Sequence, residues 1–260
     1  MRTRIAIAAI AALIAITPAR AESLLIGTSA DYPPWESVDT AGNVVGLDVD
    51  LGMEICKRID ATCTFTNQGY DGLLPGLTVG KFNMVMSAIS MTAARMEKVD
   101  FSSPYAKSSS RFVVAEGSLL NSDTSKEVTM ESLKDKVIGT QVGSAQTSAV
   151  QANLPDATVR EYDRADQMFD EVRAGRVDAI MLIETAAEDI MKSDAGKGTQ
   201  FAGPSLTGKE VPQLGMGFGI ALKKGNAELK DRLDRAIASM SADGTIKALT
   251  EKYLGKDVTP

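Results

Sequence analysis

A run of hydroxyl side chains followed by an arginine stands at the end of an apolar stretch. The hydroxyl residues are Ser87, Ser90 and Thr92, and the arginine is Arg95. The apolar stretch, Met84 to Ile89, has the composition of a buried strand. A guanidinium holds a carboxylate through parallel hydrogen bonds, which hydroxyl or backbone groups can supplement. The spacing therefore predicts a carboxylate site. The alternative is that Ser90 or Thr92 caps a helix while Arg95 lies in solvent.

A second polar segment, Gln141 to Thr147, follows the apolar strand pattern Val137 to Val142 and leads into a helical pattern. Backbone N–H groups and the helix dipole at such a junction bind an anion without any charged side chain. The alternative is that Ser144 only caps the helix. Both segments lie at predicted strand ends, which is where α/β proteins place their ligands.

Three aromatic side chains and one carboxylate also lie next to predicted strands or helices. Tyr32, Trp35 and Tyr70 stand on predicted loops, where they could stack on a ligand or could equally form a rim or a core. Glu184 directly follows the apolar strand pattern Val177 to Ile183. It is a solvated surface residue, a partner for a ligand amine, or a catalytic acid.

The sequence lacks most of the motifs that carry enzyme chemistry. It contains no histidine, which excludes Ser-His-Asp and Cys-His catalysis and imidazole metal sites. A P-loop and a Ser-x-x-Lys motif are also absent. The glycines at positions 215, 217 and 219 lie inside a strand pattern, so hinge glycines are a better interpretation than a dinucleotide fingerprint. We expect a protein without catalysis, metal or cofactor.

The elements that would position these residues alternate along the chain. Strand patterns occur at Leu24 to Ala30, Thr62 to Asn67, Met84 to Ile89, Val137 to Val142, Val159 to Tyr162 and Val177 to Ile183. Helical patterns lie between them, among them one that Asp48 would cap, one near Ser144 to Leu154 and one near Arg164 to Ala174. This alternation predicts an α/β fold with mostly parallel sheets.

Composition is that of an ordinary globular protein. The chain has 260 residues, of which 44% are hydrophobic and 24% charged. The net charge is -6 and only 5% of the residues are aromatic, so the chain has little from which to build a nucleic-acid-binding surface. We therefore expect no nucleic-acid partner.

The N-terminus has the pattern of a secretory signal peptide, residues 1–21. Arg2 and Arg4 precede an apolar run from Ile5 to Ile16, and small residues stand at Ala19 and Ala21. A membrane anchor is the alternative, but the run would span only about 18 Å of a hydrocarbon core about 30 Å thick. We expect cleavage after Ala21 and a free periplasmic protein.

The only two cysteines, Cys56 and Cys63, would then lie in an oxidising compartment, which favours a disulfide. Two buried free thiols are the alternative.

Two further strand patterns suggest that the chain crosses twice between two lobes. Arg111 to Glu116 precedes a polar stretch, Ser118 to Thr129, after which the strand and helix alternation restarts. Met216 to Lys224 is a glycine-rich strand pattern that leads into a long closing helix, Asn226 to Met240. If both are crossings, residues 22–109 and 215–260 form one lobe and residues 110–214 the other, with a hinge between them. A single large α/β domain is the alternative.

Several motifs, taken together and in order, resemble the amino-acid-binding periplasmic proteins of ABC importers. They are Asp31 to Trp35, Gly46 to Leu51, Ser87 to Arg95, Phe101 to Tyr105, Gly143 and Ser144, Gly175 to Ala179, and Asp243 to Thr245. The resemblance extends over nearly the whole mature chain. Cys56 and Cys63 are similar to the disulfide pair of the basic-amino-acid and opine-binding branch.

The resemblance implies a two-lobed clamshell, each lobe a mostly parallel sheet flanked by helices, joined by two hinge strands. Arg95 would bind the α-carboxylate of the ligand, helped by Ser90 and Thr92 from one lobe and Ser144 from the other. Tyr32 and Tyr70 would enclose the ligand side chain. The full set of expected ligand-binding residues is Tyr32, Trp35, Tyr70, Ser87, Ala88, Ser90, Thr92, Arg95, Gln141, Ser144, Ala145, Gln146, Ile183 and Glu184.

Two positions depart from the family pattern. Ser29 stands where binders of basic amino acids carry an aspartate, and Ile183 stands where an aspartate usually receives the α-ammonium group. Either a local shift brings Glu184 to the amine, or the ligand lacks an ordinary primary α-ammonium group. Opine binders resemble this chain in lacking that aspartate, and an unpaired buried ammonium is costly.

The leading hypothesis is a periplasmic, monomeric solute-binding component of an ABC importer that delivers an amino acid, or an N-substituted derivative such as an opine, to a permease. One alternative is a periplasmic enzyme on the same scaffold, similar to cyclohexadienyl dehydratase, with Glu184 as its acid. The other is a ligand-sensing module that signals to a receptor.

Overall fold

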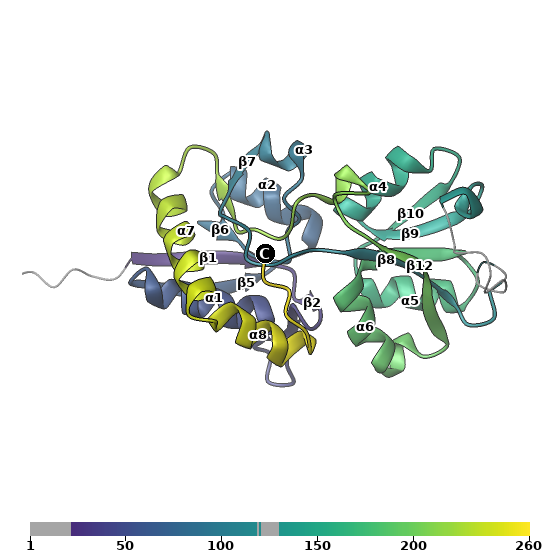
Figure 1. The fold of residues 1–260 in the computed structure, drawn as a ribbon, viewed down its shortest axis with the longest axis horizontal. Coiled ribbons are helices and arrows are strands. Elements are labelled where there is room, and N and C mark those ends of the chain that lie inside the picture. Colours follow the sequence, from purple (N-terminus) through teal and green to yellow (C-terminus); the bar gives the residue numbers. More distant parts are fainter. Residues whose placement is uncertain (1–21, 119, 121–129) are drawn as a thin grey trace, which may run out of the picture.

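The computed structural model describes residues 22–118, 120 and 130–260. The predicted signal peptide and most of the predicted polar stretch Ser118 to Thr129 lie outside these residues. The described chain forms two lobes side by side, each with its own five-stranded sheet flanked by helices (Figure 1). The predicted fold class is therefore confirmed.

The sheet of the first lobe is built from both ends of the chain, in the order β5-β1-β6-β13-β7. Its strands are β1 (Glu22–Thr28), β5 (Ala61–Asn67), β6 (Met84–Val85), β7 (Val99–Phe101) and β13 (Ala221–Lys223). Its helices are α1 (Leu47–Arg58), α2 (Leu73–Thr78), α3 (Ala93–Met96), α7 (Ala227–Ala242) and α8 (Thr245–Leu254). A small sheet of β2 (Asp31–Tyr32), β3 (Glu36–Val38) and β4 (Val44–Val45) lies beside α1.

The sheet of the second lobe comes from the middle of the chain, in the order β10-β9-β11-β8-β12. Its strands are β8 (Ser110–Ala115), β9 (Val137–Gln141), β10 (Thr158–Tyr162), β11 (Ala179–Ile183) and β12 (Thr199–Leu206). Its helices are α4 (Ala145–Asn153), α5 (Ala165–Arg173) and α6 (Glu184–Lys192).

Each sheet contains one strand that runs against its neighbours. In the first lobe β13 pairs antiparallel with both β6 and β7, and in the second lobe β8 pairs antiparallel with both β11 and β12. These are the strands that follow the two crossings, because β8 comes directly after residues 106–109 and β13 after residues 207–220. The remaining strands of each sheet are parallel to one another, as the alternation of strands and helices predicts.

Apolar stripes on the helices account for much of the core. Ala165, Met168, Phe169 and Val172 form a buried apolar stripe on α5. The buried face of α7 consists of Leu229, Leu233, Ala236, Ile237 and Met240. No helix in residues 22–118 and 130–260 is long and apolar enough to cross a membrane.

The disulfide between Cys56 and Cys63 is confirmed, and it joins the last turn of α1 to β5.

Three expectations about element boundaries were wrong. The pattern Met84 to Ile89 forms a strand only at Met84 and Val85, and the pattern Met216 to Lys224 only at Ala221 to Lys223. Asp48 does not cap α1: the N-cap position is Gly46, and Asp48 lies buried in the first turn. Its carboxylate accepts a hydrogen bond from the backbone N–H of Ala88 instead. Long-range contacts therefore override the local pattern at these sites.

Candidate ligand-binding cleft

Arg95 lies between the two lobes. Its Nη1 donates to the carbonyl of Ser90 at 3.0 Å, and its Nη2 donates to the hydroxyl of Tyr70 at 3.2 Å and to the carbonyl of Gly143 in the second lobe at 3.0 Å. Thr92 caps α3, because its hydroxyl accepts the backbone N–H of Arg95. Thr92 thus takes the capping role, while the Arg95 guanidinium faces the other lobe rather than open solvent.

Facing Arg95, the second lobe presents the junction of β9 and α4. Gly143 has a φ of 70°, and Ser144 caps α4 by accepting the backbone N–H of Thr147 at 3.2 Å. Gln146 is buried and donates to the Ser110 hydroxyl at 2.9 Å. Gln141, also buried, donates to the carbonyl of Asp163 at 3.2 Å, and Ala145 is buried beside them.

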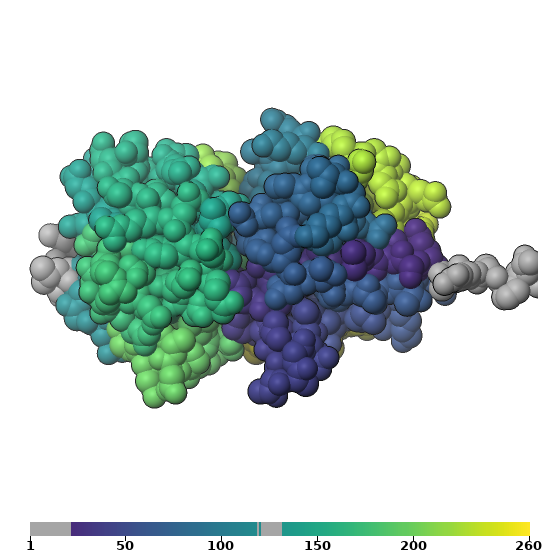
Figure 2. All heavy atoms as spheres, turned by 180° about the vertical axis from the view of Figure 1, so that it is seen from behind, coloured from purple at the N-terminus to yellow at the C-terminus, as the bar shows by residue number. Residues whose placement is uncertain are grey.

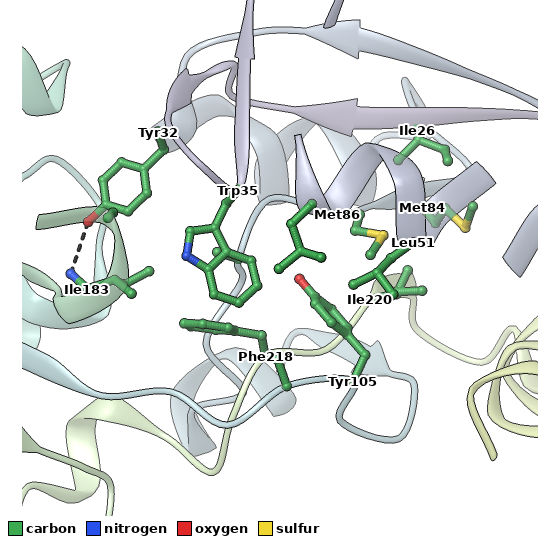
Figure 3. Close-up of a cluster of buried hydrophobic side chains, with 14 of the residues drawn as sticks. Ile26, Tyr32, Trp35, Leu51, Met84, Met86, Tyr105, Ile183, Phe218 and Ile220 are labelled. Carbon is green, nitrogen blue, oxygen red and sulfur yellow. Dashed lines mark hydrogen bonds between the residues drawn. The ribbon is translucent and has the colours of Figure 1, made fainter. Parts of the chain in front are cut away.

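Tyr32 and Trp35 connect the lobes directly. The backbone N–H of Ile183 in the second lobe donates to the Tyr32 hydroxyl at 3.0 Å (Figure 3). The indole Nε1 of Trp35 donates to the Thr185 hydroxyl at 2.9 Å, and its ring packs edge-on against Phe218 with centroids 4.9 Å apart. Because Trp35 is only 1% exposed, the structure makes it a core residue at the lobe contact.

Ser87 and Ala88 support the turn that follows β6. The Ser87 hydroxyl donates to Glu36 at 2.8 Å and accepts the backbone N–H of Ser29 at 3.0 Å. Ala88 has a φ of 43°, a left-handed conformation that is rare for residues other than glycine. The turn leads to Ser90, whose carbonyl holds Arg95.

Glu184 is engaged elsewhere. Its carboxylate accepts hydrogen bonds from Ser109 at 2.8 Å and Ser205 at 2.6 Å, and its other oxygen lies 3.4 Å from Arg111. These hydrogen bonds lower the pKa of Glu184 despite the opposing effect of its partial burial. Both oxygens of Glu184 therefore have partners in this structure, and the alternative that Glu184 receives a ligand amine stays a prediction.

Two hollows flank these contacts. One, of about 400 Å³, is lined by Tyr70, Asp71, Arg95 and Lys98 together with Gly143 of the second lobe. The other, of about 360 Å³, lies between Asp31 of the first lobe and Arg164, Asp166 and Asp189 of the second.

Asp31 lines the second hollow, and its carboxylate accepts a hydrogen bond from the Ser29 hydroxyl at 2.9 Å. Burial raises its pKa. The sequence patterns did not single out this carboxylate.

The arrangement can bind an anion between two bodies. Arg95 supplies the fixed positive charge, while the α4 N-terminus supplies backbone N–H groups from the other side. In residues 22–118 and 130–260 no group of acidic or cysteine side chains is arranged to hold a metal ion. Figure 2 shows the two lobes in contact on the face opposite to that of Figure 1.

Two lobes joined by two crossings, with an arginine held between them, define a solute-binding protein of the clamshell type. Residues 24–256 match the bacterial extracellular solute-binding proteins, family 3, and the chain belongs to this family. The class of protein predicted from the sequence is therefore confirmed.

Individual relatives are similar over nearly their whole length. The histidine-binding periplasmic protein of Escherichia coli (strain K12) is 37% identical over 240 residues, which cover 91% of this chain and 89% of the relative. The structure of an ancestral arginine-binding protein bound to glutamine matches with a TM-score of 0.80 and 31% identity, covering 91% of this chain and all of the other. That of the ancestral amino acid-binding protein AncCDT-1, a precursor of cyclohexadienyl dehydratase, matches with a TM-score of 0.76 and 29% identity, covering 89% and 95% of the two chains.

Proposed function

We propose that this chain is a monomeric periplasmic receptor that captures an amino acid, or an N-substituted derivative, and presents it to the permease of an ABC importer without catalysis. The observation that carries the proposal is the Arg95 guanidinium, held at 3.0 Å from a backbone carbonyl of the opposite lobe. Relatives named for binding histidine and arginine support an amino-acid-like ligand.

Arg95 can couple ligand binding to closure. Its Nη2 already makes two hydrogen bonds, to Tyr70 and to Gly143, so a carboxylate gripped by two parallel bonds must replace one of them. If it replaces the Gly143 carbonyl, the ligand itself bridges Arg95 and the N–H groups at the start of α4. Those cross-lobe bonds exist only in the shut state, so the ligand shifts the population toward it.

The ligand class depends on what can receive an amine. Ile183 supplies no side-chain acceptor and its backbone N–H donates to Tyr32, while the Glu184 carboxylate accepts hydrogen bonds from Ser109 and Ser205. An N-substituted ligand such as an opine, whose secondary amine has fewer N–H groups to satisfy, suits this position better than a primary ammonium group. Asp31, which lines the hollow of about 360 Å³, is a candidate partner for a cationic side chain.

A thermal-shift screen tests the ligand class. The panel comprises L-histidine, L-arginine, L-lysine, L-glutamine and the opines octopine and nopaline. A compound at a concentration 100 times its Kd adds about 2.7 kcal/mol to the free energy of unfolding, which raises the melting temperature measurably. A shift with opines but not with their parent amino acids supports the N-substituted class, and no shift across the whole panel contradicts the proposed function.

Replacing the arginine tests the carboxylate grip. Arg95→Ala is expected to abolish binding of the panel compound that stabilises the wild type, while it changes the melting temperature of the ligand-free protein little. Binding is measured by isothermal titration calorimetry. Arg235→Ala, on the exposed face of α7, is the matched control and should bind as the wild type does. Retained affinity in Arg95→Ala would exclude this grip.

An enzyme on the same scaffold is the second candidate, and the likeness to a precursor of cyclohexadienyl dehydratase is the observation that favours it. Incubation of the pure protein with prephenate or arogenate, followed by absorbance of the aromatic product, separates the two functions. Turnover that is lost in Glu184→Gln would support the enzyme and contradict our proposal.

A further inference from the structure

Two buried acidic side chains lie behind the turn from Ser87 to Ser90 and have no role in the grip described above. Glu36 in β3 is 1% exposed and Asp48 in the first turn of α1 is 0% exposed. A buried carboxylate normally needs a cation or several hydrogen-bond donors. Their partners therefore show how the fold tolerates them.

One oxygen of each carboxyl group is well satisfied. Glu36 Oε1 accepts the Ser87 hydroxyl at 2.8 Å. Asp48 Oδ2 accepts the backbone N–H of Ala88 at 2.7 Å and the hydroxyl of Tyr105 at 2.9 Å. Both groups thus hold the turn from Ser87 to Ser90, Glu36 through a side chain and Asp48 through the backbone.

The other oxygens, Glu36 Oε2 and Asp48 Oδ1, have no hydrogen-bond donor among the described residues. The two carboxyl groups bond to adjacent residues of one turn, Glu36 to Ser87 and Asp48 to Ala88, and the Asp48 charge raises the pKa of Glu36. Two ionised carboxylates would place two negative charges in this buried region and leave two acceptors without a donor. A proton held by one group and donated to the other removes one charge and supplies a donor.

We propose that Glu36 is a neutral carboxylic acid whose O–H donates a hydrogen bond to the Asp48 carboxylate. This acid pair positions the turn from Ser87 to Ser90. The turn needs such support because Ala88 adopts a left-handed φ of 43°. It delivers the Ser90 carbonyl to Arg95, so the inference rests on the proposed binding function.

The electrostatics agree with this assignment. Burial raises the pKa of Asp48 to about 7, and burial together with the Asp48 charge raises the pKa of Glu36 well above its usual range. The other titratable groups that face the pair are Tyr105, which follows β7, and Asp31 in β2, whose charge opposes ionisation of Glu36 further. Glu36 is therefore the member that keeps its proton.

The proton has a spectroscopic signature that does not depend on any ligand. Infrared spectra of the ligand-free full chain at pH 8, above the pKa of about 7 of Asp48, should contain the C=O stretching band of a protonated carboxylic acid. Glu36→Gln should lose this band, and Glu161→Gln, which removes an exposed carboxylate from β10, should retain it. A wild type without the band, or a Glu36→Gln variant that keeps it, overturns the proposal.

The pH dependence of stability gives a second test. The folded protein keeps this proton above pH 4.5, the ordinary pKa of the group, whereas the unfolded chain releases it. The free energy of unfolding should therefore fall as pH rises from 4.5 toward the raised pKa of Glu36. Across this window the unfolding constant of the wild type, relative to that of Glu36→Gln, should rise by up to about tenfold per pH unit. Parallel profiles for the two proteins contradict the shared proton.

Binding then tests the positioning role, with L-arginine as the probe. The amide of Glu36→Gln can still donate to Asp48 and accept from Ser87, so its Kd should stay near that of the wild type. Glu36→Met removes the donor and should raise the Kd about tenfold at pH 7 in protein whose circular dichroism is unchanged. Equal Kd values for Gln and Met variants refute positioning. If the wild type binds neither L-arginine nor octopine, the proposed ligand class fails, while the infrared band still decides the acid pair.

Discussion

At the scale of single residues, the cleft contains the positive charge of Arg95 but has no carboxylate at position 183 to pair with a ligand amine. Arg95 is held by three acceptors, from Ser90, Tyr70 and Gly143. Ile183, in contrast, offers no side-chain acceptor for a ligand amine. In the proposed function Arg95 binds the ligand carboxylate and no side chain at position 183 pairs with an amine, so adding a carboxylate there should change which ligand binds.

Ile183→Asp is expected to convert the cleft toward ordinary α-amino acids. The new carboxylate lies at a position that is 7% exposed, so without ligand it is desolvated and should lower the melting temperature. With L-arginine bound, its α-ammonium group pairs with the carboxylate, and the Kd should fall by at least about tenfold, or roughly 1.4 kcal/mol. A thermal scan measures the melting temperature of the ligand-free variant, and isothermal titration calorimetry measures the Kd.

Ile183→Asn is the matched control, because it adds a polar group of the same size without the charge. Equal affinities of the Asp and Asn variants for L-arginine would show that the ammonium group does not lie near this residue.

At the scale of elements, the sequence periodicity predicts the strands and helices well but not where the chain turns toward the cleft. The predicted strand from Met84 ends at Val85. It ends there because Ala88 adopts a left-handed conformation, in which its backbone N–H donates to the Asp48 carboxylate. Such a contact joins residues 40 positions apart and leaves no local pattern.

The second crossing shows the same limit. Gly215 and Gly217 have φ values of 81° and 136°, and a Cβ atom on either would lie 2.7 Å from a carbonyl oxygen, that of Met91 or that of Ala106. The pattern Met216 to Lys224 therefore yields a close-packed crossing with a short strand at its end, although hydrophobicity alone indicates a long strand.

The site residues also fall into those that the sequence predicts and those that it does not. The hydroxyl and arginine spacing pointed to Arg95, and the strand-to-helix junction pointed to Ser144. Thr185 and the Gly143 carbonyl were not predicted, since their roles arise only where the two lobes meet. Asp48 was predicted only as a helix cap and Glu36 was not predicted at all, because their burial depends on contacts with the distant residues Ser87 and Ala88.

The disulfide joins α1 to β5, and it should stabilise the fold without affecting ligand affinity. Replacing both Cys56 and Cys63 by serine is expected to reduce the free energy of unfolding by about 2.5 kcal/mol, the chain-entropy value for so short a loop. Urea unfolding under oxidising conditions measures the loss. Cys63 pairs with Leu24 near the start of β1, whereas the cleft lies beyond the strand ends, so ligand affinity should not change. A changed Kd would show that the disulfide affects the cleft. The control is the wild type unfolded in the presence of a reductant.

At the scale of the whole molecule, the lobes are linked at places that should respond differently to opening. Lys256 in the C-terminal tail contacts Glu188 of α6 at 2.8 Å, and the backbone N–H of Lys107 in the first crossing donates to the carbonyl of Val258 at 2.7 Å. The C-terminus therefore lies against the hinge, midway between the lobes (Figure 1). Contacts near a hinge move little during a rotation. The bonds of Arg95, Tyr32 and Trp35 cross the cleft instead, so opening must break them.

Trp35→Phe should therefore shift the molecule toward an open form. Phenylalanine keeps an aromatic ring beside Phe218 but loses the hydrogen bond to Thr185, which is worth about 1 kcal/mol, or roughly a fivefold change in the open-to-closed ratio. Small-angle X-ray scattering should show a larger radius of gyration for the ligand-free variant than for the wild type. Thr185→Val removes the other partner and should expand the molecule in the same way. Because both variants remove one bond, the double variant should expand no further than either one, and additive expansion would mean that this bond does not hold the lobes together.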